Sequence, residues 1–220
     1  MLQTKNKINI LSILLILTIS TSVSFSQNLF EGKVKIKVSS DNEIFFMNYF
    51  TNGTDIKIEM LNEGTELGSF IKSGDKTIIL MQAQKMYMEI NDDFIKNLPN
   101  MKEEQSEKEV KISKTGETKN INGFNCEKWI ISNEEYNVEA WVTDQLGDFT
   151  ILSNPMGSGY NPLWGPVFEQ GGFFPILVVS KDEDDSENKF EVLEVEKQKL
   201  TKEFFMPPAD YTKMNFPMMK

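Results

Sequence analysis

The sequence contains no arginine and no histidine, and its only cysteine is Cys126. Structural zinc sites take most of their four ligands from cysteine and histidine, so this composition argues against a zinc site. Without a histidine to activate it or a second cysteine to pair with it, Cys126 is interpreted as a buried, small apolar side chain on a strand. No spacing of Asp, Glu or Lys marks a general acid and base. We therefore predict no catalytic residue, no metal and no cofactor, and a protein that is not an enzyme.

Positive charge is also scarce. The 23 basic residues, all lysine, face 33 acidic residues, which gives a formal net charge of -10. A surface of this sign repels nucleic acid and anionic lipid head groups, so we expect no nucleic-acid partner. The acidic run at residues 182–187 lacks the spaced ligands and the internal glycine of a calcium loop, and we interpret it as a solvated turn.

The N-terminus has the pattern of an export signal. Lys5 and Lys7 precede an apolar run at residues 8–19, and Ser24-Phe25-Ser26 forms a small-x-small cleavage site. The run is too short to cross a membrane as a helix, and no cysteine follows it for lipid attachment. We expect residues 1–26 to be removed and residues 27–220 to form a single domain with no transmembrane segment, exported to the periplasm or secreted.

Short apolar-polar alternations fill most of the remaining chain and predict β-strands. The clearest hairpin signal is Asn122-Gly123, because both residues tolerate the positive φ of a tight turn. We predict a short helix at residues 91–98, a polar connector at 100–109 and one helical turn at 144–148. The expected strands are residues 27–38, 43–51, 54–61, 67–72, 76–82, 85–90, 109–114, 124–131, 136–143, 174–180 and 189–197.

A long segment at residues 154–173 has no regular period but carries many apolar side chains. Such segments are uncommon inside compact domains, and this one is too apolar for a disordered linker. We expect it to cover the inner face of the sheet, because a curved sheet with little helix must bury that face against another layer. The residues at 204–211 close the chain as an apolar, proline-rich tail.

Three stretches resemble an uncharacterised family of small secreted bacterial proteins. They are Lys-x-Ile-x-Gly-Phe-x-Cys-x-Lys-Trp at residues 119–129, Glu-Ala-Trp-Val-Thr at 139–143 and Phe-Met-Pro-Pro-x-x-Tyr at 205–211. That family is similar in outline to the outer-membrane lipoprotein carriers LolA and LolB. The resemblance implies a mostly β fold: one curved antiparallel half-barrel of ten or eleven strands, with one or two short helices and loops over its concave side.

Methionine is frequent in the first group of strands. Met60, Met86 and Met88 lie on the faces expected to point inward, and methionine adapts to irregular apolar surfaces. An ordinary core filled with flexible side chains is the alternative to a cavity. If a cavity forms, the aromatic loop would act as its lid. The residues predicted to line the cavity and lid are Phe46, Met60, Met86, Met88, Trp141, Tyr160, Trp164 and Phe168.

Two main functions fit these patterns. The first is an envelope protein that binds or carries a hydrophobic small molecule, a lipid or an acyl chain on the covered concave face. The second is a module with a solid core that docks an envelope protein partner through a sheet edge or the aromatic loop. An enzyme of unknown type is a third reading, and it would require two buried carboxylates, or a carboxylate and a lysine, to converge in a cleft.

Overall fold

A computed structural model describes residues 29–40, 43–91, 110–133, 136–150, 164–168, 171–181 and 187–214 of the chain. Several expected features lie outside these residues: the export signal, the connector at 100–109, most of the helix expected at 91–98, and residues 182–186 of the acidic run.

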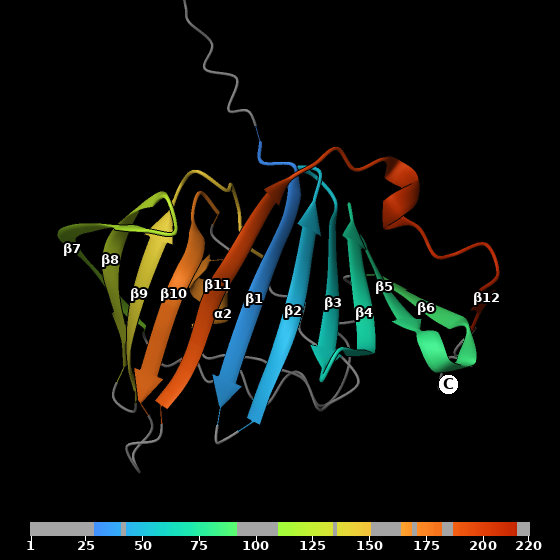
Figure 1. Cartoon of the computed structure of the whole chain (residues 1–220), viewed down its shortest axis with the longest axis horizontal. Helices are drawn as coiled ribbons and strands as arrows, with labels where there is room; N and C mark the ends of the chain where they lie inside the picture. The colour runs from blue at the N-terminus through green and yellow to red at the C-terminus, as the bar shows by residue number, and fades with distance from the viewer. Residues whose placement is uncertain are drawn as a thin grey trace, which may run out of the picture.

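Twelve strands form one sheet (Figure 1). They are β1 (Gly32–Ser40), β2 (Glu43–Thr51), β3 (Ile56–Asn62), β4 (Thr65–Ser73), β5 (Lys76–Met81), β6 (Met86–Asn91), β7 (Lys111–Ile121), β8 (Phe124–Ser132), β9 (Asn137–Thr143), β10 (Phe174–Lys181), β11 (Glu187–Lys197) and β12 (Thr212–Lys213). A single α-helical turn, α2 (Gly165–Phe168), and short 3-10 turns at Gln82–Gln84 and Lys202–Phe205 complete the described elements.

The strand order is β12-β6-β5-β4-β3-β2-β1-β11-β10-β9-β8-β7. Neighbours pair antiparallel except β12, which runs parallel to β6. The order describes two meanders, β1 to β6 and β7 to β11. Within the described residues the sheet joins them only through the pairing of β1 with β11. We call this pairing the seam; it places β1, the first strand, beside β11, the last long strand.

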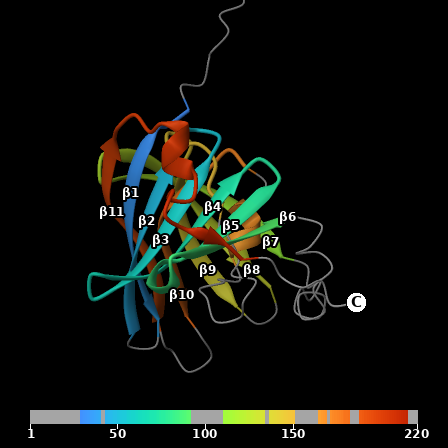
Figure 2. The ribbon, with the colours of Figure 1, turned by 90° about the vertical axis from the view of Figure 1, so that its right-hand side faces the viewer.

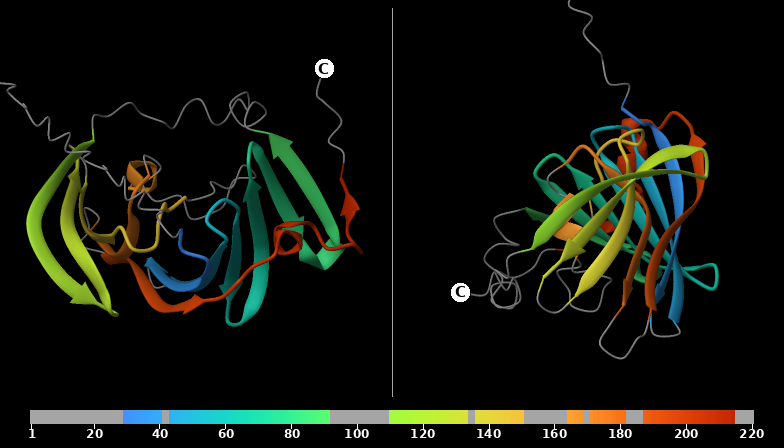
Figure 3. Two further views of the ribbon diagram at one scale, coloured as in Figure 1. Left: turned by 90° about the horizontal axis from the view of Figure 1, so that it is seen from above. Right: turned by 90° about the vertical axis from the view of Figure 1, so that its left-hand side faces the viewer.

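The predicted fold is confirmed. The sheet curves into a half-barrel that does not close, with β7 and β12 at its two edges (Figure 3). Asn122 and Gly123 both have positive φ, 53° and 88°, as the predicted tight turn between β7 and β8 requires. The sheet has one strand more than expected, since β12 follows the tail. Residues 144–146 form a bend and a turn rather than the expected helical turn.

Alternation along the seam gives the sheet two different faces. On one face the lysines of β1 stand opposite the glutamates of β11, and such opposite-charge pairs contribute about 0.2–1 kcal/mol each. These pairs are Lys33 with Glu196, Lys35 with Glu194 and Lys37 with Glu191. The other face carries Val34, Ile36 and Val38, which have no exposed surface. That apolar face is the concave one, and α2 lies inside its curve (Figure 3, left).

The C-terminal tail covers part of the convex face. Phe205 packs against Phe50, Ile71, Ile78 and Leu80 in a small apolar cluster. The 3-10 turn at Lys202–Phe205 lies on the side of the sheet that faces the viewer in Figure 2. Two ion pairs then hold the end of the tail to the β5–β6 hairpin and to β6: Lys85 Nζ lies 2.7 Å from Asp210, and Lys213 Nζ lies 2.5 Å from Glu89. The apolar tail expected from the sequence therefore packs on the convex face, and we call this tail the strap.

Candidate functional site

An aromatic cluster fills the concave face over β8 to β11, β1 and β2. Phe149, in the loop after β9, lies at its centre. Its ring centroid is 4.9 to 6.4 Å from those of Tyr49, Trp164, Phe168, Phe174 and Phe190. These separations are those of favourable stacked and edge-to-face pairs. This part of the concave face is therefore a packed core, and we call it the aromatic half.

Trp164 and Phe168, predicted as lid residues, belong to this core. Trp164 immediately precedes α2 and Phe168 is its last residue, and the two side chains are only 3% and 2% exposed. The Phe168 ring stacks on Trp129 at 6.1 Å, and Trp164 meets Phe190 edge to face at 5.3 Å. The third predicted lid residue, Tyr160, lies outside the described residues. The expected cover of the concave face is thus present at α2, where it is anchored by rings buried as deeply as the strand residues.

The concave face of β3 to β6 is different. Phe70, Ile79, Met88 and Ile90 form a separate buried cluster, and Met60 and Met81 pack against it while remaining partly accessible. Every one of these side chains comes from a strand. Met86 is half-buried, and alternation along β6 puts it on the same face as Met88. We call this surface the methionine half; Met60 also contacts the aromatic half and so joins the two.

The structure places Met60, Met86 and Met88 on the same face of the sheet and puts Phe46 and Trp141 on the other face. Phe46 stands opposite Lys37 on the convex face, with Lys35 Nζ 5.9 Å from its ring centroid. Trp141 is opposite Lys128, whose Nζ is 5.7 Å from its ring, and its indole N–H donates to Glu139 at 3.0 Å. Both rings therefore lie on the convex side, among lysines.

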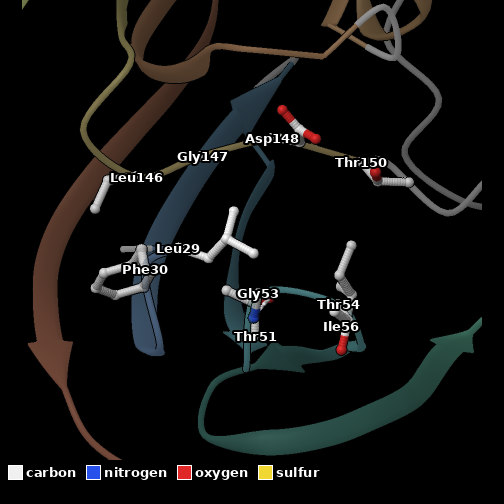
Figure 4. A pocket seen from close by; sticks show the side chains of 10 residues that line it. All are labelled: Leu29, Phe30, Thr51, Gly53, Thr54, Ile56, Leu146, Gly147, Asp148 and Thr150. Carbon is white, nitrogen blue, oxygen red and sulfur yellow. Dashed lines mark hydrogen bonds between the residues drawn. The ribbon is translucent and has the colours of Figure 1, made fainter. Parts of the chain in front are cut away.

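A pocket of about 150 Å³ opens at the end of the half-barrel where the chain enters β1 (Figure 4). Its walls come from the start of the domain, the β2–β3 turn and the loop after β9. The lining residues are Leu29, Phe30, Thr51, Gly53, Thr54, Ile56, Leu146, Gly147, Asp148 and Thr150. None of them was predicted as a site residue, because most lie in turns and loops, where periodicity carries no signal.

Hydrogen bonds fix one wall of this pocket. The Tyr49 hydroxyl donates to the backbone carbonyl of Asp148 at 3.5 Å, and burial raises the pKa of that hydroxyl far above its ordinary value. The Asp148 carboxylate accepts a hydrogen bond from the Gly172 N–H at 2.5 Å. The loop after β9 is thus held from the core side by Tyr49 and from the other side by the loop before β10.

Cys126 is a buried, free thiol on β8, as predicted. Burial raises the pKa of the thiol, which opposes the reactive thiolate form. Across the described part of the chain, no group of three or more Cys, Asp and Glu side chains is placed to hold a metal ion. Among the same residues no helix is both long and apolar enough to span a bilayer.

Solved structures are similar to this chain at low sequence identity. An uncharacterised conserved protein from Thermus thermophilus matches with a TM-score of 0.50 and 12% identity over 84% of this chain and 90% of that one. The MucA/MucB complex of Pseudomonas aeruginosa gives 0.49 and 8% over 86% and 60% of the two chains. The lipoprotein LppX of Mycobacterium tuberculosis gives 0.36 and 8% over 78% and 89%.

No curated protein matches the chain. The family model of a domain of unknown function, DUF4412, matches residues 30–211. This range includes every described strand except β12. The predicted membership of an uncharacterised family is thereby confirmed, and this chain is a member of the DUF4412 family.

Proposed function

We propose that this protein is an exported envelope protein that binds a hydrophobic molecule, a lipid or an acyl chain, on the methionine half of its concave face. The observation that carries the proposal is the contrast inside the half-barrel. Rings from α2 and the loop after β9 fill the aromatic half, whereas the described cluster on β3 to β6 consists of strand side chains alone.

The composition of the methionine half supports an adaptable binding surface. Methionine has three rotatable bonds and a polarizable sulfur, so it packs against ligands of varied shape. Met60, Met81 and Met86 are half-buried and offer accessible apolar surface, while Met88 lies deeper beside Phe70. The methionines stand on β3, β5 and β6, and Phe70 on β4 lies between them, which gives a continuous apolar strip across the sheet.

The test is to purify residues 27–220 without detergent and examine the protein by native mass spectrometry and organic extraction. We expect a bound apolar molecule in the wild type and at least a fivefold lower occupancy in Met60→Gln/Met86→Gln. Glutamine has nearly the shape of methionine but must bury an amide, which costs about 1–3 kcal/mol when it is unpaired. Since both side chains are half-buried, the variant should stay folded.

Met206→Gln is the matched control, because Met206 is 58% exposed on the tail. It should retain the ligand at the wild-type level, and all three proteins should have melting temperatures within a few degrees. A wild-type protein that carries no apolar molecule and takes none up from envelope lipids would refute the proposal. Equal ligand occupancy in the variant and the control would instead show that the ligand binds somewhere other than the methionine half.

A second candidate function rests on β7, the edge strand of the second meander. Its first ten residues are all exposed, and Ile112 and the preceding Val110 are 40% and 36% exposed. An exposed edge offers unpaired backbone groups to an extended segment of another protein. If the purified protein is free of lipid, this edge is the surface on which to search for an envelope partner. Ile112→Lys would then be expected to abolish capture.

A further inference from the structure

One row of residues runs across the concave face from β2 to β6. Its members stand beside one another on neighbouring strands, so their side chains point to the same face. They are Met47, Met60, Gly68, Met81 and Met86. The register that pairs Ser69 with Leu80 puts Gly68 beside Met81. Four methionines from four strands therefore meet at one level of the sheet, and a glycine stands in the middle of their row.

Most of this row is accessible. Met47 is buried in the aromatic half, whereas the four residues from β3 to β6 are half-buried, and we call these four the methionine row. The next row along the strands is buried throughout; it consists of Ile58, Phe70, Ile79 and Met88. On the other side the strands end in the β3–β4 and β5–β6 turns, at the lower end of these strands in Figure 1, where Asn62, Thr65 and residues 82–85 are exposed. The accessible apolar surface is therefore one row wide.

The shape of the methionine row suits a narrow ligand. Rows on one face are two residues apart along a strand, which makes this one about 7 Å wide. From β3 to β6 it crosses three strand spacings of about 4.8 Å, a length of about 14 Å. Within the described residues, neither this row nor the buried row beside it contains a charged side chain. A long, narrow and uncharged surface matches an extended hydrocarbon chain lying across the strands.

Gly68 makes the middle of the methionine row deeper than its ends. A Cβ atom at this position would meet nothing within 4 Å, so the space of a side chain is open there. Met60 and Met81 stand on either side of that space, on strands about 9.6 Å apart. The φ angle of Gly68 is not positive, so no left-handed backbone conformation requires a glycine here. Glycine at this position therefore contributes open space rather than a special backbone conformation.

We infer that the methionine row binds an extended, unbranched hydrocarbon chain across β3 to β6, and that Gly68 is the residue that determines this preference. The chain lies along the row and enters the open space at Gly68, where Met60 and Met81 close on it from both sides. A compact ring system is too wide to enter that space. The inference rests on the proposed function, because it names the shape of the ligand that the methionine half receives.

The experiment compares dodecanoate with adamantaneacetate by calorimetry at neutral pH, below the concentrations at which either aggregates. The two ligands have the same number of carbon atoms and one carboxylate each, so a substitution that changes the ratio of their affinities reports on shape. We expect the wild type to bind dodecanoate about tenfold more tightly. Gly68→Leu fills the open space and should weaken dodecanoate binding by about tenfold, while adamantaneacetate binding changes by less than about twofold.

Gly68→Ala and Ser113→Leu complete the set of variants. Alanine takes up part of the open space and should weaken dodecanoate binding by about two- to threefold, and it decides the question if the leucine variant does not fold. Ser113 is exposed on β7, at the opposite edge of the sheet, and leucine there should leave the binding of both ligands unchanged. Thermal melting of each variant reports whether it is folded.

The outcomes separate this inference from the proposed function. If Gly68→Leu and Gly68→Ala bind dodecanoate like the wild type while Met60→Gln/Met86→Gln does not, the inference is wrong and the proposed function stands. Tighter binding of adamantaneacetate than of dodecanoate would overturn the inference alone. A wild type that binds neither probe but carries an apolar molecule when purified would do the same. If it binds neither and carries none, both proposals fail.

Discussion

The two halves of the concave face bury their apolar side chains in different ways. A curved, unclosed sheet exposes its inner face unless another layer covers it. In the aromatic half, Phe149, Trp164 and Phe168 reach in from outside the strands and pack against strand residues such as Phe174 and Phe190. In the methionine half the described side chains belong to the strands themselves. The fold is therefore anchored on one side and adaptable on the other.

The difference between the two halves lies in the stiffness of their side chains. Aromatic rings have few rotatable bonds and pack at preferred angles, so a cluster such as that around Phe149 specifies one arrangement. A methionine side chain can fill the same space in several conformations, so it does not specify one arrangement. For the proposed function, keeping the two kinds of packing apart leaves the fold fixed while the binding surface adapts. The comparison therefore predicts that stability is concentrated in the aromatic half.

The strongest test of this contrast removes a ring from the aromatic half. Phe168→Ala should lower the free energy of unfolding by about 3–5 kcal/mol, because it deletes a fully buried ring and leaves a cavity between Trp129 and Trp164. Met60→Ala removes a half-buried side chain and should cost only about 1–2 kcal/mol. Urea denaturation monitored by tryptophan fluorescence measures both values. Similar losses for the two variants would show that the halves are equally structural.

The seam between the meanders gives a second test. A Cβ atom added at Gly32 would stand 2.1 Å from the backbone carbonyl oxygen of Glu196, so the β1–β11 pairing would have to shift. Gly32→Ala should therefore cost about 1–3 kcal/mol, the usual range for overpacking.

Gly68→Ala is the control for that substitution. Gly68 lies on β4 in the methionine half, where a Cβ atom meets nothing within 4 Å, and alanine there should raise stability by about 0.5 kcal/mol. Equal unfolding midpoints for the two variants would mean that the seam tolerates a shift. It would then not be the point on which the two meanders depend.

The strands and the half-barrel that they form were largely predicted from the sequence, and the pairing that joins the two meanders was not. Alternation of apolar and polar residues located the long strands, and it correctly grouped Met60 with Met88 on one face. The seam of β1 with β11 leaves no local pattern, since its partners are separated by most of the chain. Pairing of such distant segments depends on the global fold rather than on periodicity.

The misplacement of Phe46 and Trp141 has a related cause. A period of two assigns residues to opposite faces but does not say which face becomes concave. Phe46 lies between Phe45 and Met47 on a strand with apolar residues on both sides, so the sequence offers no criterion for choosing. Phe149 and most of the residues lining the end pocket were missed because they lie in turns and loops. Their roles follow from tertiary contacts alone.

The smallest predicted effect concerns acid, and it should be confined to β6 and β12 at the edge of the sheet. Hydrogen bonds and charge from Lys213 and Lys76 hold the pKa of the Glu89 carboxyl below its ordinary value of 4.5. A carboxylate with a lowered pKa stabilises the fold at pH values above its ordinary pKa, and this contribution is lost as the pH falls through the lowered value. Between pH 8 and pH 5 the strap should be unaffected.

As the pH falls through the lowered pKa of Glu89, the link between β12 and β6 should loosen while the aromatic half stays intact. The measurement is hydrogen exchange of the β6 and β12 amides, corrected for the intrinsic effect of pH, with Glu89→Gln at pH 7 as a mimic of the protonated state. Because exposed ion pairs contribute little, we expect exchange to quicken by only about two- to fivefold in the variant. At a pH well below the lowered pKa of Glu89, the wild type and the variant should exchange alike. Quickening that extended equally to β8 and β9 would show that the strap supports the whole sheet, and the contrast between its halves would not hold.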